Sequence, residues 1–112
     1  MAIFMLNNQT VTNILPHELL NKAVGMKEKN LRLIAISCTK KENLSITYSF
    51  DNNYNMENLR LDIDFNTEID SISGIFEYAY LYENEIKDLF KVKINDISID
   101  FKGNFYRIKE NN

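Results

Sequence analysis

The sequence predicts an α+β fold, a two-layer sandwich in which a mainly antiparallel sheet of about four strands carries two helices on one face. Two stretches that alternate strictly between apolar and polar residues, 44–50 and 59–65, indicate strands with one face on the core and one in water. Two longer stretches with apolar residues at helical spacing, 16–30 and 74–90, indicate the helices. The protein has 112 residues, close to the commonest domain size, so we expect residues 1–112 to form a single domain.

The first helix is expected to begin at Pro16, because proline suits the first helical position, where its missing N–H group has no partner to lose. The helix should end near Lys29 and Asn30. Apolar residues that recur on one of its faces predict the side that packs on the sheet: Leu19, Leu20, Ala23 and Val24. The preceding residues, 10–14, fit either a short strand or an irregular arm.

Three strands are expected to follow this helix. Residues 31–37 are almost continuously apolar, which favours a strand covered on both faces. The two alternating strands turn their apolar residues inward: Leu44, Ile46, Tyr48 and Phe50 in the first, and Leu59, Leu61, Ile63 and Phe65 in the second. The link 39–43 is short and polar, so the first two strands should form a hairpin. Residues 97–101 alternate once more and predict a late strand.

The second helix, expected over residues 74–90, has two different faces when its residues are placed at intervals of about 100°. One narrow stripe is apolar and predicts the core face: Ile75, Ala79, Tyr82, Ile86 and Leu89, with Tyr78 and Phe90 at its borders. Phe76 and Tyr80 fall on the opposite side. Glu83 and Lys87 lie beside them, four residues apart in the favourable order for an ion pair.

Two aromatic rings on a side that faces solvent indicate a protein interface, where aromatic residues are enriched. Phe76 and Tyr80 are therefore candidate partner contacts. The alternative is that the C-terminal tail folds back over them with its own apolar residues, Phe105, Tyr106 and Ile108. Glu85 and Asp88 lie at the edge of the core stripe, where they would either cap neighbouring backbone amides or meet basic groups on another chain.

Few residues of this sequence could hold a metal or carry electrons. Cys38 is the only cysteine, which excludes a disulfide within the chain and an iron–sulfur cluster held by its cysteines. His17 is the only histidine and is expected at the surface. The net charge of −3 argues against nucleic acid and anionic membranes as partners. No apolar run has the length of a membrane span, and the first residues lack the features of a signal peptide, so we expect a cytoplasmic protein.

Two patterns that suggest a metal site or catalysis are weak. Residues 51–62 echo a calcium loop, but Met56 stands where the loop needs a glycine and the flanks are predicted strands, so a polar hairpin is expected instead. Glu83, Glu85 and Asp88 would suit acid–base catalysis in a small hydrolase. The sequence supplies no nucleophile with a base and no phosphate-binding loop beside them.

The segment "SISGIF…YLYENEIKDLFKVKI", residues 71–94, resembles the signature of the respiratory complex I 30 kDa subunit family, a family of NADH dehydrogenase subunits. Its members include subunits of energy-converting NiFe hydrogenases. In the family a Ser-Ile step leads into a helix with a fixed pattern of acidic and apolar residues. The matching positions here are Ser71, Ile72, Glu83, Glu85, Ile86, Asp88, Leu89, Phe90 and Val92. The downstream residues 94–109 are most similar to the branch found in Ech-type energy-converting hydrogenases.

This resemblance implies a structural and assembly subunit that has no cofactor and is not an enzyme by itself. Its partners would be a large NiFe-hydrogenase-like or 49 kDa-like subunit and a small iron–sulfur subunit, and it would lie peripheral to the membrane through the complex. The residues expected at the partner contact are Glu83, Glu85, Asp88, Phe90, Phe76, Tyr80 and Lys87. Two alternatives stay open: an orphaned stand-alone interaction module of the same fold, and the small hydrolase. An uncovered sheet edge also leaves a homodimer of the isolated chain open.

One position departs from the family pattern. Lys91 stands where the family usually has a glycine. If that glycine takes a left-handed conformation at the end of the helix, a lysine there costs about 1 kcal/mol, unless the turn is reshaped.

Overall fold

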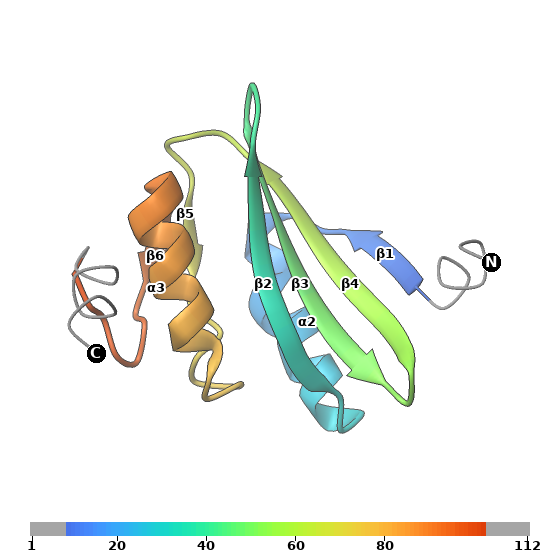
Figure 1. The fold of residues 1–112 in the computed structure, drawn as a ribbon. Coiled ribbons are helices and arrows are strands. Elements are labelled where there is room, and N and C mark those ends of the chain that lie inside the picture. Colours follow the sequence, from blue (N-terminus) through green and yellow to red (C-terminus); the bar gives the residue numbers. More distant parts are fainter. Residues whose placement is uncertain (1–8, 103–112) are drawn as a thin grey trace.

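The computed structural model describes residues 9–102 and has the predicted α+β architecture (Figure 1). Along the sequence its elements are β1 (Gln9–Asn13), the 3₁₀ helix η1 (Pro16–Glu18), α2 (Leu19–Glu28), β2 (Arg32–Lys40), β3 (Leu44–Asn52), β4 (Asn55–Ile63), β5 (Glu68–Asp70), α3 (Ala79–Phe90) and β6 (Lys93–Asn95). The main sheet has the strand order β1-β4-β3-β2, in which β1 is parallel to β4 and the other neighbours are antiparallel. β5 and β6 form a separate parallel pair.

The core lies between the main sheet and the two helices. β3 is an interior strand, and its predicted inward residues are all at most 2% exposed: Leu44, Ile46, Tyr48 and Phe50. Leu19 and Ala23 of α2 join the same cluster, as do Ala79 and Ile86 of α3. The two helices therefore cover the same face of the sheet, as predicted.

β4 has the predicted alternation, but it begins and ends earlier than expected. Three of its four predicted inward residues are buried: Leu59, Leu61 and Ile63. Phe65 is 42% exposed, so its predicted place in the core is wrong. The reason is a turn after the strand, in which the Asp64 carboxylate accepts the Asn66 N–H at 2.8 Å and the Thr67 hydroxyl at 2.9 Å.

The prediction that the first strand of the hairpin is covered on both faces is wrong, because Ile36 is the only buried residue of β2, whereas Ile34 and Ser37 are exposed. β2 is also an edge strand of the sheet. Its pairing with β3 shifts register between Leu33 and Ala35, so Ile34 is the extra residue of a β-bulge. The bulge turns both Leu33 and Ile36 toward the core, which explains the continuous apolar run. The hydroxyl of Tyr82 donates to the Ile34 carbonyl at 2.8 Å and ties α3 to this strand.

The first helical segment begins and ends where the sequence predicts. η1 starts at Pro16, and the Glu18 carboxylate accepts the Leu15 N–H at 2.8 Å, which satisfies a backbone donor at the start of the segment. The helix ends before Lys29, and Asn30 then takes a left-handed conformation with φ 63°. Asparagine tolerates this conformation better than most residues, so the sharp stop is compatible with the sequence.

The buried face of α2 differs in part from the prediction. Leu19 and Ala23 are fully buried, as expected. Leu20 and Val24 are 39% and 43% exposed, and Met26 takes the third buried position instead. Met26 lies three residues after Ala23 and therefore on the same side of the helix, so it extends the buried row formed by Leu19 and Ala23.

Both predicted polar links are hairpin turns. β2 and β3 pair up to Lys40 and Leu44, and β3 and β4 pair up to Asn52 and Asn55. In the second turn the N–H of Tyr54 donates to a side-chain oxygen three residues earlier, at 3.2 Å. The polar stretch that echoed a calcium loop is thus a tight hairpin, as expected.

The segment after α3 is not the predicted strand. Residues 97–101 are irregular, and β6 lies earlier, where it pairs with β5. Asp96, directly after β6, has φ 63°, which ends the extended conformation. The prediction of a strand at 97–101 is therefore wrong, and its polar and apolar residues have different partners, which are described below.

α3 begins at Ala79, five residues later than predicted. The N–H groups of Ile75 and Phe76 both donate to the Ile72 carbonyl at 2.9 Å, so the backbone turns tightly before the helix. These turns carry the Phe76 ring into the core against Phe50, with ring centroids 5.2 Å apart. Phe76 is only 6% exposed, and the prediction that it faces solvent is wrong.

The substitution Tyr82→Phe should lower the free energy of unfolding by about 1 kcal/mol, because the Ile34 carbonyl loses its side-chain donor. The matched control is Tyr48→Phe. The Tyr48 hydroxyl is buried without a hydrogen-bond partner among the described residues, so its removal should leave stability unchanged or raise it. Denaturant unfolding measures both effects, and an equal loss in both variants would contradict this assignment.

Candidate docking surface

The first acidic residue of α3, Glu83, joins the helix to the loop that precedes it. Its side chain is fully buried. One carboxylate oxygen accepts the Ser71 hydroxyl at 2.6 Å, and the other accepts the Ile72 N–H at 2.9 Å. The predicted ion pair between Glu83 and Lys87 is therefore wrong, because the carboxylate turns to donors in the core.

A series of hydroxyl groups extends this contact. The Ser71 hydroxyl gives its one hydrogen to Glu83, so the Ser73 hydroxyl, 2.7 Å away, donates to Ser71. Ser73 in turn accepts the Ser98 N–H at 2.9 Å. Each donor points toward the carboxylate, and the series connects the loop before α3, the helix and the segment after β6. We call this network, Glu83 with Ser71, Ile72, Ser73 and Ser98, the carboxylate clasp.

Several ionisable groups near the core are shifted by their surroundings. Burial raises the pKa of Glu83 to about 6, although the hydrogen bonds from Ser71 and Ile72 oppose this shift. Burial, and after it the charge of Glu83, raises the pKa of the Tyr48 hydroxyl well above its usual value. Burial also raises the pKa of the Cys38 thiol to about 11, which makes the reactive thiolate scarce. In each case burial is the main cause of the shift.

Asn84 is a residue of α3 that the sequence analysis missed. Its side chain is 2% exposed. Its Nδ2 donates to the carbonyls of Tyr80 and Ile99, each at 2.7 Å, and its Oδ1 accepts the Phe101 N–H at 2.8 Å. Asn84 thereby fastens residues 99–101 along the helix. Asparagine is a poor helix former, and its place inside a helix is the signal that could have indicated a tertiary role.

The same segment covers two of the predicted interface residues. The Tyr80 ring meets the Phe101 ring edge-on, with centroids 6.3 Å apart. The Lys87 ammonium binds both oxygens of the Asp100 carboxylate, at 3.0 and 2.8 Å, and this contact holds the pKa of Asp100 below its usual value. The tail residues that were expected as an alternative cover lie outside the described residues: Phe105, Tyr106 and Ile108.

The side of α3 that points away from the core carries exposed apolar residues. Tyr78, Leu81 and Leu89 are 68%, 41% and 54% exposed, so the prediction that Leu89 lies in the core is wrong. The reason is that the carboxylate clasp turns a different row of the helix inward. Glu85 and Asp88 are half-buried on the same side. We call these five residues the outer stripe of α3.

The seven predicted partner contacts thus divide into two groups. Phe76 and Glu83 are buried in the protein's own core. The others keep part of their surface exposed: Tyr80, Glu85, Lys87, Asp88 and Phe90. Whether these five meet a partner stays a prediction.

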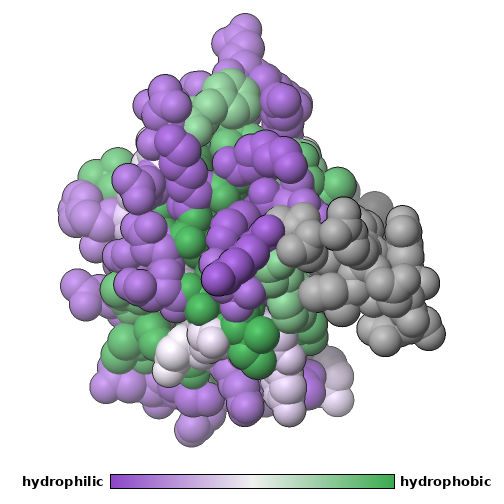
Figure 2. Space-filling model, turned by 90° about the vertical axis from the view of Figure 1, so that its left-hand side faces the viewer, coloured by the Kyte–Doolittle hydropathy of each residue, from purple (hydrophilic) through white to green (hydrophobic). Residues whose placement is uncertain are grey.

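Hollows lie at both ends of α3. The hollow at its start has a volume of about 590 Å³ and is lined by Leu31, Leu33, Phe76 and Leu81, among others. The Lys27 ammonium stands 5.3 Å from the centre of the Phe76 ring beside it. Figure 2 shows the side of the molecule that carries α3, which is mostly hydrophilic with hydrophobic patches mainly in its lower half. An apolar hollow rimmed by charges has the composition of a protein-docking site.

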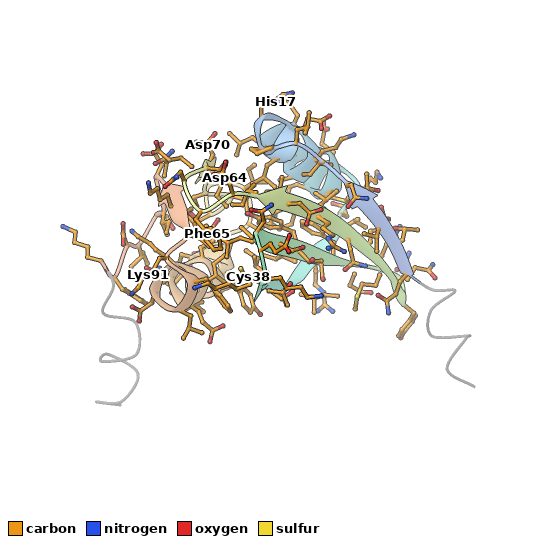
Figure 3. All side chains as sticks on the ribbon, turned by 90° about the horizontal axis from the view of Figure 1, so that it is seen from above. His17, Cys38, Asp64, Phe65, Asp70 and Lys91 are labelled. Carbon is orange, nitrogen blue, oxygen red and sulfur yellow. The ribbon has the colours of Figure 1, made fainter. Side chains whose placement is uncertain are left out.

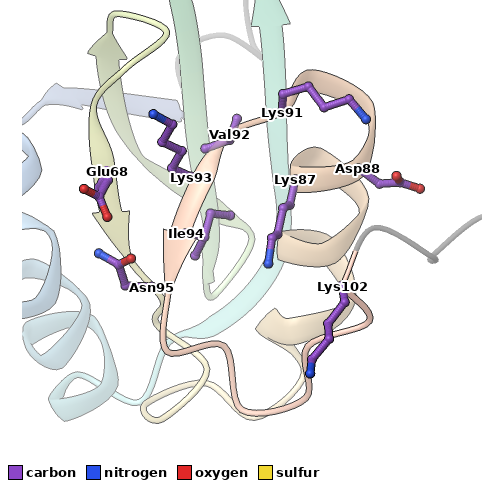
Figure 4. A pocket seen from close by; sticks show the side chains of 9 residues that line it. All are labelled: Glu68, Lys87, Asp88, Lys91, Val92, Lys93, Ile94, Asn95 and Lys102. Atoms are coloured by element: carbon purple, nitrogen blue, oxygen red, sulfur yellow. The ribbon is translucent and has the colours of Figure 1, made fainter.

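The hollow at the end of α3 has a volume of about 540 Å³ and is lined mainly by residues with charged side chains (Figure 4). Charged residues of both signs line it: Glu68, Lys87, Asp88, Lys91, Lys93 and Lys102. In Figure 4 the lysine side chains point in different directions rather than toward one centre. Convergent donors are what an anion site needs, and this arrangement does not provide them.

The structure does not gather the candidate chemical residues into one site. Glu83 faces the core, whereas Asp88 lines the hollow at the end of the helix. Cys38 and His17 lie on different parts of the molecule, and His17 is exposed as expected (Figure 3). Over residues 9–102 there is no group of three or more His, Cys, Asp or Glu side chains that could hold a metal ion.

The family model described as respiratory-chain NADH dehydrogenase, 30 kDa subunit, matches residues 12–98. The protein belongs to this family. The matched span contains both the outer stripe of α3 and the carboxylate clasp, and it places the protein among the subunits of an oxidoreductase complex. No curated protein matches the sequence. Within the part of the protein that the structure describes, no helix is long and apolar enough to cross a membrane.

The backbone at the end of α3 is left-handed at Lys91, the position at which the sequence resemblance predicts a glycine. Lys91 closes α3 with φ 60° and ψ 30°, and its N–H donates to the Lys87 carbonyl at 3.0 Å. The lysine therefore adopts the strained conformation and does not reshape the turn. Other residues with positive φ include Asn30 and Asp96, whose short polar side chains tolerate it better.

Lys91→Gly should raise the free energy of unfolding by up to about 1 kcal/mol, because glycine has no Cβ to clash in this conformation. Lys91→Ala is the control, since it removes the charge and the long side chain but keeps the Cβ. Thermal or denaturant unfolding compares the variants. A gain of equal size in Lys91→Ala would show that the side chain, and not the backbone, is the source of strain.

The raised pKa of Glu83 predicts a pH dependence of stability. The carboxyl group ordinarily titrates near pH 4.5, whereas burial raises its pKa in the folded protein to about 6. The folded state therefore binds more protons between these values, and the stability contributed by this group falls by about 2 kcal/mol as the pH rises through the window. In Glu83→Gln this fall should be absent, as measured by denaturant unfolding below and above the window.

The control for that experiment is Glu85→Gln, which makes the same change of net charge on the same helix. Other carboxylates also titrate with pH, so the useful quantity is the difference in unfolding free energy between each variant and the wild type. A difference for Glu83→Gln that stays constant across the window would contradict the burial of this carboxylate.

Proposed function

We propose that this protein is a non-catalytic structural and assembly subunit of a complex-I-like oxidoreductase or an Ech-type NiFe hydrogenase. The observation that carries the proposal is the family match over residues 12–98. The similarity of residues 94–109 to the Ech-type branch supports the hydrogenase form of it. Its partners are a large NiFe-hydrogenase-like or 49 kDa-like subunit and a small iron–sulfur subunit, which place it at the cytoplasmic side of a membrane-bound complex.

The outer stripe of α3 is the surface proposed to meet these partners. Tyr78, Leu81 and Leu89 supply exposed apolar surface on one side of a helix. The apolar hollow at the start of α3 continues this surface. Glu85 and Asp88 add carboxylates to it, which favours a partner surface that carries lysine or arginine.

The buried members of the predicted contact set serve this surface indirectly. Glu83 and Phe76 anchor the helix and the loop before it, so that the outer stripe keeps one orientation. Docking surfaces gain affinity when they need no ordering on binding. Tyr80 and Lys87 contact the segment after β6, and Phe90 packs against the core, so these three residues are set apart from the outer stripe.

Glu85→Lys should weaken assembly about tenfold or more while the isolated domain stays folded, because it reverses a charge at the proposed contact. The measurement is an anaerobic affinity pull-down of the tagged protein from its native cell extract, quantified by mass spectrometry. Glu42→Lys, an equal charge reversal in the exposed β2–β3 turn, is the control. Loss of folding in Glu85→Lys would make this acid structural.

The second candidate is an orphaned interaction module that keeps the fold and has lost the complex. The observation in its favour is Lys91, which stands at the C-terminal end of α3 where the resemblance to the family predicts a glycine. The same pull-down separates the two. Recovery of a large subunit with a small iron–sulfur subunit supports the first proposal, and recovery of the bait alone at native expression supports the second.

A further inference from the structure

The two edges of the main sheet differ in how they are protected. The β2 edge has the bulge at Ile34, whose carbonyl is already bound by the Tyr82 hydroxyl. Charged residues, Arg32 and Lys40, stand at the two ends of this strand. Bulges and edge charges are the usual devices that prevent a sheet edge from pairing with another protein.

The β1 edge has none of these devices. The strand reads QTVTN, without a charged residue or proline, and its register with β4 runs without a shift from Gln9 to Asn13. All five residues are exposed. Figure 1 shows β1 at the outer side of the sheet with no described element beyond it. Such an edge is a template for a further strand.

Hydrogen bonds show which backbone groups of β1 already have partners. The Ile14 N–H, just after the strand, donates to the Arg60 carbonyl of β4 at 2.9 Å. The Thr10 carbonyl accepts the Asn58 side chain of β4 at 3.0 Å. Alternate residues of a strand point their N–H and C=O groups to opposite sides, so Thr12 also faces β4.

The remaining three residues of the strand, Gln9, Val11 and Asn13, therefore direct their N–H and C=O groups away from β4. These groups form a regular row of donors and acceptors along the outer edge. Val11 stands at the centre of the row, and its side chain is 58% exposed.

The side chains of β1 form a chemical palindrome about Val11. Thr10 and Thr12 are equivalent on either side of it, and Gln9 and Asn13 both end in a carboxamide. We propose that the outer edge of β1 pairs antiparallel with β1 of a second copy of this protein, about a two-fold axis through Val11. The inference does not depend on the proposed function, since it uses only the sheet edge.

This pairing brings like groups together without any charge conflict. Val11 faces the Val11 of the second copy, and Gln9 faces Asn13, at the positions whose backbone groups point outward. Thr10 faces Thr12, and pairs of threonines across strands are favourable. The contact is the same on both copies, as a two-fold dimer requires, and it joins two four-stranded sheets into one.

The test is sedimentation equilibrium of the full-length protein over a range of concentrations. The wild type should show a monomer–dimer equilibrium. Val11→Lys places two ammonium groups face to face on the axis and should raise the dimer dissociation constant about tenfold or more, with partial recovery at high salt. Ile34→Lys, the same kind of change on the protected β2 edge, should leave the constant unchanged.

A second variant separates a loss of the dimer from a loss of folding. In Val11→Pro only an outward N–H is removed, so the β1–β4 bonds stay intact while the dimer weakens. Hydrogen exchange adds a local readout, because the Val11 amide should become protected as the concentration rises. A protein that stays monomeric at every concentration overturns the proposal, and a Val11 amide protected in that monomer would assign the edge to another segment of the same molecule. A dimer that both Val11 variants leave intact overturns it as well.

Discussion

Most of the arrangement around α3 depends on where the Glu83 carboxylate lies. A carboxylate in the core costs several kcal/mol unless hydrogen-bond donors surround it, and here Ser71 and the Ile72 N–H supply them. This requirement sets the loop before α3 against the helix. Through Ser73 and Ser98 it also sets the segment that follows β6. The helix cannot rotate about its axis without breaking these bonds.

The other faces of α3 follow from this anchor. Asn84, the next residue, binds the backbone of residues 99–101, and Lys87 binds Asp100 of the same segment. The remaining side of α3 carries the outer stripe. The residues that carry the sequence resemblance therefore act in two places, because Ser71 and Glu83 build the interior while Glu85 and Asp88 lie nearer the surface.

Locally unfavourable features also gather around this helix. They are a buried carboxylate, the left-handed Lys91 and the Tyr48 hydroxyl, which has no hydrogen-bond partner among the described residues. Each costs on the order of 1 to 3 kcal/mol, which is large beside a typical stability of roughly 5 to 15 kcal/mol. Apart from the Tyr48 hydroxyl, the alternating residues of β3 and β4 follow their local preferences. The sheet thus provides the stability, and α3 carries the features that need a particular geometry.

The sequence by itself determined the fold class, the bounds of the first helix and the inward faces of β3 and, except for Phe65, of β4, because alternation and helical spacing record which side of an element meets the core. It could not determine the bulge at Ile34 or the start of α3, which depend on how neighbouring elements pack. It also could not determine whether the side chains of Glu83, Asn84 and Leu89 point toward the core or toward solvent. Local spacing paired Glu83 with Lys87, but its donors come from the loop at Ser71, twelve residues away. Only the tertiary structure places such partners together, because a buried polar side chain turns to whichever donors the fold brings beside it.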